Sequence, residues 1–226
     1  MNELDWEGYG TMHIPDGFLD TKVWTTTTIA GAGALAYALK KTKLTISRKE
    51  VPKIALIGAF IFAAQMINFP IAGATSGHFL GGTLASILFG PFIGFIMMSC
   101  VLIVQAFVFQ DGGITVLGAN MLCTGLVGCT VGYVLYNSGM RLTQGRWHNI
   151  VTPITTFVAA WCSIVTASAC VSLLLAWSGT VPLGAALTAM VGWHSLIGIG
   201  EGLITTMIIS YLAERKTVLN PVEVSE

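Results

Sequence analysis

Residues 78–110, HFLGGTLASILFGPFIGFIMMSCVLIVQAFVFQ, form a run of 33 residues without Asp, Glu, Lys or Arg. A single helix of this length would measure about 50 Å, whereas the hydrocarbon core of a bilayer is about 30 Å thick. The run contains Gly90-Pro91, and proline breaks or kinks a helix because it lacks an N–H and clashes with the preceding turn. We therefore predict two helices divided at Gly90-Pro91, with one kinked helix as the alternative.

The composition extends this interpretation to the whole chain. Hydrophobic residues make up 54% of the 226 residues and charged residues only 10%, whereas soluble proteins carry roughly 25% charged residues. Most of the surface must therefore face lipid. The formal net charge is zero, and no basic patch points to nucleic acid. We predict an all-α, polytopic transmembrane bundle of about seven helices, drawn from the run above and from five further stretches with at most one charge each: residues 23–39, 54–75, 112–136, 150–177 and 181–213.

Three clusters of basic residues indicate the topology. Residues 40–53 hold six Lys or Arg, and residues 141–146 and 215–216 hold two each. Basic loops favour the cytoplasmic side of a membrane. Dividing the 78–110 run places all three clusters there, which gives seven helices and an N-terminus outside. We expect the embedded bundle at residues 12–216, an N-terminal extension at residues 1–11 and a cytoplasmic tail at residues 217–226.

Two histidine-bearing segments are the first candidates for chemistry. His13 precedes Pro15-Asp16-Gly17, a turn signal that would fold the N-terminal segment back onto the bundle. His78 follows residues 65–77, whose proline and glycines predict an irregular connection, and such backbone is tolerated at membrane depth only when buried in protein or lining a cavity. The topology puts both histidines on the outer side, so we predict a transition-metal site between them. The simpler interpretation of each is a hydrogen-bonded structural histidine.

Other polar residues in the apolar stretches have structural as well as chemical interpretations. Asp111 could cap a helix start, or could support a metal site together with Gln65 or Asn68. His194 is interpreted as a hydrogen-bonded structural residue, and Glu201 either as a proton relay or as a carboxyl group bonded to a neighbouring helix. A membrane enzyme using His194 and Glu201 as an acid–base pair is disfavoured, because seven residues separate them by about two helical turns.

At three segments the sequence resembles the CbiM/NikM family, the substrate-specific subunits of energy-coupling factor (ECF) transporters for cobalt and nickel. The segments are MHIPDGFL at 12–19, FAAQMINFPIAGATSGHFLGG at 62–82 and FQDGGITVLGAN at 109–120. They occur in the family's order, and the apolar stretches extend the likeness to about residue 213. The resemblance implies a seven-helix fold like that of ECF substrate-binding components, a location in the bacterial cell membrane, and capture of Ni(II) or Co(II) for uptake.

The resemblance also implies a metal site formed by the mature N-terminus. Carried onto this chain, the ligands are the amine of Met12, the amide nitrogen and ring of His13, and the ring of His78. These nitrogens close fused chelate rings in one plane, a geometry that suits Ni(II) better than Co(II). Eleven residues precede Met12: either they are removed, or Met12 is the true start, or the extension is retained and the amine ligand is lost.

The partners implied by the resemblance are a transmembrane coupling protein, a pair of ATPase subunits and a small accessory membrane protein. The sequence has no GxxxxGK[ST] phosphate-binding loop, so we assign ATP hydrolysis to the ATPase subunits and expect a transport subunit without a cofactor, not an enzyme. Ala55, Ala59 and Ala63 recur every four residues and form a smooth helix face, a candidate docking surface for the coupling protein. The alternative function is a secondary transporter or channel that moves the ion unaided.

Overall fold

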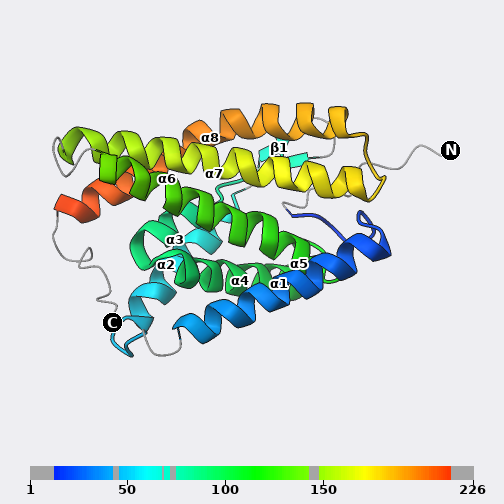
Figure 1. The fold of residues 1–226 in the computed structure, drawn as a ribbon, viewed down its shortest axis with the longest axis horizontal. Helices are drawn as coiled ribbons and strands as arrows, with labels where there is room; N and C mark the ends of the chain where they lie inside the picture. Colours follow the sequence, from blue (N-terminus) through cyan, green and yellow to red (C-terminus); the bar gives the residue numbers. More distant parts are fainter. Residues whose placement is uncertain (1–12, 43–45, 68, 72–74, 143–147, 215–226) are drawn as a thin grey trace.

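The computed structural model describes residues 13–42, 46–67, 69–71, 75–142 and 148–214. Within these residues the fold is a bundle of helices (Figure 1). Residues Leu117–Leu142 form one continuous helix, so the described part holds seven helices, and the predicted number is confirmed. The elements in chain order are α1 (Thr21–Thr42), α2 (Val51–Gln65), β1 (Phe69–Ile71), β2 (Thr75–Gly77), α3 (Gly82–Phe89), α4 (Pro91–Val108), α5 (Leu117–Asn120), the π-helical segment η2 (Met121–Val127), α6 (Gly128–Leu142), α7 (His148–Trp177) and α8 (Leu183–Glu214).

Four of these helices are long and apolar enough to cross a membrane: α4, the continuous helix Leu117–Leu142, α7 and α8. α2 is apolar but has only 15 residues. α1 has 22 residues and carries a run of four threonines, which lowers its hydropathy. Hydroxyls within that run donate hydrogen bonds to carbonyl oxygens one turn earlier, for example from Thr27 to Val23 at 2.9 Å. Thr25, Thr26 and Thr27 are therefore satisfied inside the helix itself, whereas the Thr28 hydroxyl donates to the Thr115 carbonyl at 3.4 Å.

The charge-free run 78–110 divides where the sequence predicted. α3 ends at Phe89, Gly90 adopts a positive φ of 83°, and Pro91 opens α4. The length of α3 differs from the expectation of a second full span, because its 8 residues measure only about 12 Å. Seven of the eight are buried, so α3 is a half-helix inside the protein. The hairpin and residues 78–81 make up the rest of the return from α2 to α4.

The connection predicted to be irregular contains a small antiparallel hairpin. β1 pairs with β2 in the register Phe69 to Gly77 and Ile71 to Thr75. Hydropathy does not distinguish this hairpin from the end of an apolar helix, because its residues are equally uncharged. The hairpin positions residue 78 at the start of an extended connection that leads into α3.

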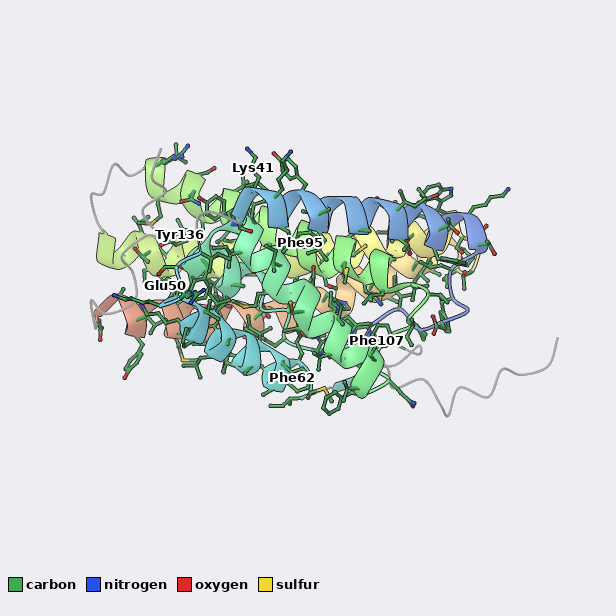
Figure 2. All side chains as sticks on the ribbon, turned by 90° about the horizontal axis from the view of Figure 1, so that it is seen from below. Lys41, Glu50, Phe62, Phe95, Phe107 and Tyr136 are labelled. Carbon is green, nitrogen blue, oxygen red and sulfur yellow. The ribbon has the colours of Figure 1, made fainter. Side chains whose placement is uncertain are left out.

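The two ends of the bundle differ in charge. The C-terminal ends of α1, α6 and α8 lie at the same end (Figure 1), and the last turns of α1 and α6 carry Lys40, Lys41 and Arg141. Figure 2 shows Lys41 and Glu50 towards this end and Phe107 towards the other. This agrees with the predicted clustering of basic residues on one side; Arg146 and residues 215–216 lie outside the described residues.

Glycines allow the helices near the N-terminal segment to approach closely. A Cβ atom placed on Gly118 would lie 2.3 Å from the Cα atom of Thr28, and one on Gly31 would lie 3.0 Å from the carbonyl oxygen of Gly118. α1 and α5 therefore cross with backbone against backbone. This crossing fixes the loop before α5, which forms one wall of the site described next.

Candidate metal centre

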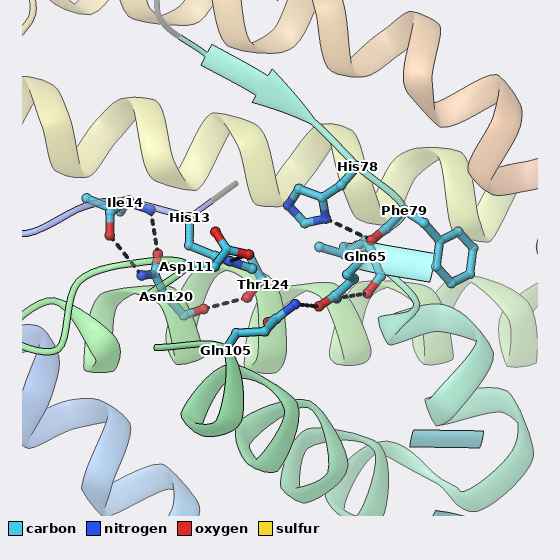
Figure 3. A network of polar contacts seen from close by, with 10 residues as sticks. His13, Ile14, Gln65, His78, Phe79, Gln105, Asp111, Asn120 and Thr124 are labelled. Carbon is cyan, nitrogen blue, oxygen red and sulfur yellow. Dashed lines mark hydrogen bonds and ion pairs between the residues drawn. The ribbon is translucent and has the colours of Figure 1, made fainter. Parts of the chain in front are cut away.

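The structure brings His13 and His78 together. Their ring centroids lie 5.0 Å apart at an interplanar angle of 52°, and both side chains are buried. His78 points towards His13 across the space between the N-terminal segment and the connection before α3 (Figure 3). The two residues are 65 positions apart in the sequence, so this proximity is created by the fold.

The N-terminal segment is held against the bundle by backbone hydrogen bonds. The Ile14 N–H donates to Oδ1 of Asn120 at 3.0 Å, and Nδ2 of Asn120 donates to the Ile14 carbonyl at 3.1 Å. The Gly113 N–H donates to the same carbonyl at 2.9 Å. These three bonds place the neighbouring His13 side chain inside the protein, the orientation expected from the Pro-Asp-Gly turn.

The carboxylate of Asp16 adds a second attachment. It accepts hydrogen bonds from the N–H groups of Ile114 at 3.1 Å and Thr115 at 2.8 Å, and from the Thr115 hydroxyl. Burial by itself would raise the pKa of Asp16, but the hydrogen bonds from Thr115 and from nearby backbone amides outweigh it, so the pKa lies below its ordinary value of 3.8. The turn is therefore fastened by a carboxylate that is charged at neutral pH.

Asp111 lies beside His13 and not at a helix start, so the capping interpretation is wrong. Its Oδ2 atom is 3.7 Å from Nδ1 of His13, whereas α5 begins after Val116, which makes no side-chain cap. The Asp111 N–H donates to the Gln105 carbonyl at 3.0 Å. A Cβ atom on Gly112, whose φ is +87°, would come within 2.7 Å of the His13 Cβ atom. The loop therefore passes His13 at a distance that only glycine permits.

His78 is oriented by its own connection. Its Nδ1 atom lies 2.8 Å from the Phe79 carbonyl oxygen, and because a carbonyl only accepts, Nδ1 carries the hydrogen and Nε2 carries the lone pair. Burial and the neighbouring His13 lower the pKa of His78 to about 4. At neutral pH the ring is thus an uncharged imidazole, the form that binds metals.

Two glutamines extend the polar network below the histidines (Figure 3). Nε2 of Gln105 donates to Oε1 of Gln65 at 2.9 Å, and Nε2 of Gln65 donates to the Leu80 carbonyl at 2.7 Å. Gln65 was predicted from the sequence to support the site, whereas Gln105 and Asn120 were not. Each is a polar residue within an otherwise apolar helix, and such residues usually face the bundle interior, so that signal was present. Asn68, also named, lies outside the described residues.

The two histidine rings fit a metal ion that is also bound by main-chain nitrogens. Both ring nitrogens of His13 are buried and have no hydrogen-bond partner among the described residues, and buried polar atoms are normally satisfied. Across the described part of the chain, no group of three or more His, Cys, Asp or Glu side chains could hold a metal ion. A metal between the two rings would need main-chain ligands or ligands outside the described residues, and Met12 is one such residue.

His194 and Glu201, the two ionisable residues of α8 that the sequence singled out, make different contacts. Nδ1 of His194 lies 2.6 Å from the Met190 carbonyl of its own helix, in agreement with a structural histidine. Glu201 accepts hydrogen bonds from the N–H groups of Leu80 and Gly81. Its carboxyl group is therefore bonded to the connection before α3, and not to a neighbouring helix as one interpretation had it.

These features define a class of protein. The chain is a polytopic membrane protein in which a buried pair of histidines, one from the N-terminal segment and one from a connection between helices, lies inside a seven-helix bundle.

The chain belongs to the CbiM family, described as the cobalt uptake substrate-specific transmembrane region, whose model matches residues 13–219. The bundle resembles the crystal structure of a truncated transition metal transporter with a TM-score of 0.81 and 30% sequence identity, covering 90% of this chain and 99% of that one. The resemblance inferred from the three sequence segments is confirmed. The family is one of transport proteins, not enzymes.

Two relatives give the range of substrates named within the family. A protein of Archaeoglobus fulgidus assigned as a fused nickel transport protein, NikMN, is 38% identical over 204 residues, which are 89% of this chain and 65% of that protein. A protein of Methanococcus voltae assigned as a cobalt transport protein, CbiM, is 30% identical over 211 residues, covering 92% of this chain and 94% of that protein. The chain thus spans slightly less than two thirds of the fused relative.

Proposed function

We propose that this chain is the substrate-binding membrane subunit of an ATP-driven ECF-type transporter that imports Ni(II) or Co(II). The observation that carries the proposal is the buried pair of His13 and His78, with ring centroids 5.0 Å apart and with no hydrogen-bond partner for either ring nitrogen of His13 among the described residues. Two imidazoles at this separation can share one metal ion. Family membership supports the same function.

The proposed ligands are Met12, His13 and His78, through the Met12 amine, the His13 amide and ring, and the His78 ring. Support comes from the described residues, in which no group of three or more His, Cys, Asp or Glu side chains could hold a metal ion, so that main-chain nitrogens are the natural ligands to complete the site. A planar set of nitrogens favours Ni(II) over Co(II), so nickel is the first choice. The proposal requires a free amine at Met12, and therefore requires residues 1–11 to be absent from the mature protein.

We further propose that α2 docks the transmembrane coupling protein. Ala55, Ala59 and Ala63 are all exposed in the isolated chain, and small residues at this spacing let two membrane helices approach closely. ATPase subunits acting through that coupling protein would supply the energy, with a small accessory membrane protein as the fourth component. The basic ends of α1 and α6 support a cell-membrane orientation with the C-terminus in the cytoplasm and the metal site outside.

The ligand set is tested by intact mass and metal content of the purified protein after loading with nickel or cobalt. A mass beginning at Met12, with one metal ion per chain, is expected. His13→Ala and His78→Ala should each abolish stoichiometric binding, whereas His194→Asn should retain it and serves as the matched histidine control. If protein with the mass of the full-length chain retains one tightly bound nickel ion, the Met12 amine is excluded as a ligand. If His78→Ala leaves metal binding unchanged, the whole proposed site is contradicted.

The energy source is tested by uptake of radioactive nickel into cells that produce the chain with or without a coupling protein and its ATPases. We expect uptake only with the complete set, and loss of uptake when the ATPase is inactivated. Sustained uptake by the chain alone would favour the secondary transporter or channel.

A further inference from the structure

Glu201 is a buried carboxylate whose two oxygen atoms are both engaged by one short piece of backbone. Oε2 accepts the Leu80 N–H at 2.7 Å and Oε1 accepts the Gly81 N–H at 3.0 Å. The side chain is 2% exposed. Burial of a carboxylate costs free energy unless hydrogen bonds replace its water, so these two donors account for its presence in the middle of α8.

The backbone that Glu201 holds is the connection that carries His78. Leu80 follows His78 by two residues, and its carbonyl accepts a hydrogen bond from Nε2 of Gln65 at 2.7 Å. The connection is therefore fixed from two sides, by α8 through Glu201 and by α2 through Gln65. Gly81 has a φ of +80°, and a Cβ atom there would lie 2.6 Å from the Ile61 side chain, so the backbone at this point has little room for another path.

The same network reaches the opposite side of the site. Gln65 accepts a hydrogen bond from Gln105, and the carbonyl of Gln105 accepts one from the Asp111 N–H. Asp111 in turn faces His13 at 3.7 Å. A continuous series of hydrogen bonds and covalent links, completed by the contact between Asp111 and His13, thus runs from Glu201 to both histidines, and the Glu201 carboxyl group lies at its far end.

We propose that Glu201 is a positioning residue for metal capture, which holds the Leu80–Gly81 backbone so that the His78 ring faces His13 before the metal arrives. The inference rests on the proposed function, because it assigns Glu201 a role in the same site. A ligand that is already oriented loses less conformational freedom on binding, which increases affinity. Glu201 itself touches the backbone and not the metal.

The test compares Glu201→Gln with Ser163→Ala in the chain that begins at Met12, the form that the proposed ligand set requires. Glutamine keeps the size of the side chain but replaces one acceptor oxygen by an NH₂ group. That group would face a backbone N–H, from which it accepts no hydrogen bond. In the metal-free variant we expect faster hydrogen–deuterium exchange in the peptide that contains Leu80 and Gly81. Nickel affinity should fall about 10- to 100-fold, the usual effect of losing a group that orients a ligand, while the visible absorption spectrum at saturating nickel stays as in the wild type.

Ser163→Ala is the matched control, because Ser163 is also buried and donates an interhelical hydrogen bond, to the Gly128 carbonyl at 2.8 Å. It should lower thermal stability and leave both nickel affinity and exchange at residues 80–81 unchanged. If Glu201→Gln does not fold, Glu201→Asp, which keeps both oxygens but withdraws them by one methylene group, is measured in its place with the same expectations.

The outcomes separate the two proposals. Wild-type protein beginning at Met12 that binds neither nickel nor cobalt overturns the proposed function, and the exchange experiment on metal-free protein still decides whether Glu201 orders the connection. Wild-type protein that binds nickel, with Glu201→Gln binding it equally well, overturns the positioning role alone. An affinity loss in Ser163→Ala as large as in Glu201→Gln would also overturn it, because the effect would then follow from general destabilisation.

Discussion

Asn120 contacts the backbone of Ile14 with both ends of its side-chain amide, accepting from the N–H at 3.0 Å and donating to the carbonyl at 3.1 Å. The two residues are 106 positions apart. The amide thus pairs with the backbone of the N-terminal segment in the way a neighbouring strand would. Because Ile14 follows His13, this pair of bonds determines where the proposed ligand His13 lies.

Replacement of Asn120 by alanine should weaken both the fold and the site. Two buried hydrogen bonds at about 0.5–1.5 kcal/mol each predict a loss of about 1–3 kcal/mol in the free energy of unfolding. Nickel affinity should fall about 10- to 100-fold, because His13 loses its orientation. Thermal unfolding and nickel titration measure the two effects. Asn137→Ala is the control, since Asn137 donates to the Tyr133 carbonyl of its own helix, and nickel affinity equal in the two variants would contradict the prediction.

Gly113 is expected to tolerate no side chain. A Cβ atom there would lie 2.4 Å from both the backbone nitrogen and Oδ1 of Asp16, so Gly113→Ala must displace the N-terminal segment. Overpacking of this kind costs about 1–3 kcal/mol, and we expect reduced nickel affinity with His13 and His78 both intact. Gly33→Ala provides the comparison, because a Cβ atom on Gly33 meets nothing within 4 Å. Equal nickel affinities for the two alanine variants would show that the segment does not need this close approach.

Much of the fold follows from local properties of the sequence. The number of helices and the break at Gly90-Pro91 depend on hydropathy and on proline geometry, which are read from neighbouring residues. The meeting of His13 and His78 required one further step, the assignment of both segments to the same side from the distribution of Lys and Arg. The distribution of Lys and Arg indicates the side of the membrane on which His13 and His78 lie, but not the distance between them.

The remaining features depend on pairings between distant residues. Asn120 to Ile14 spans 106 positions and Glu201 to Leu80 spans 121, and no periodicity relates such pairs. The half-length of α3 was also missed, because residues 78–81 are as uncharged as the helix that follows and hydropathy does not separate extended from helical backbone. The rule that polar residues in spans face inward identifies Glu201, Gln105 and Asn120 as important without naming their partners.

The crossing of α1 and α5 should be sensitive to a single methyl group. In Gly118→Ala the new Cβ atom would lie 2.3 Å from the Cα atom of Thr28 and 2.7 Å from the Thr27 carbonyl oxygen. Both neighbours are backbone, so the helices themselves must separate, and we expect a loss of about 1–3 kcal/mol or more. Thermal unfolding of the purified variant measures this. Gly192→Ala, with open space around the added methyl group, should leave stability unchanged or slightly increased, and a similar loss in both variants would rule out the close crossing as the cause.

Asp16 should make stability depend on pH below neutrality. Its pKa is lowered in the folded protein, where hydrogen bonds from Thr115 and nearby amides outweigh burial, so the carboxylate stabilises the fold above its unfolded pKa of about 3.9. That contribution is lost as pH falls through the lower, folded pKa. Wild type should therefore unfold at a higher temperature than Asp16→Asn at pH 7, and the difference should shrink once the pH falls below about 4.

Unfolding midpoints of both proteins between pH 7 and pH 3 measure this dependence. Glu50→Gln is the charge control, because it removes one carboxylate at the opposite end, where Glu50 pairs with Lys53 in an exposed ion pair at 3.3 Å that contributes little. A difference between wild type and Asp16→Asn that stays constant over the whole range would mean that the hydrogen bonds from Ile114 and Thr115 do not depend on the charge of Asp16.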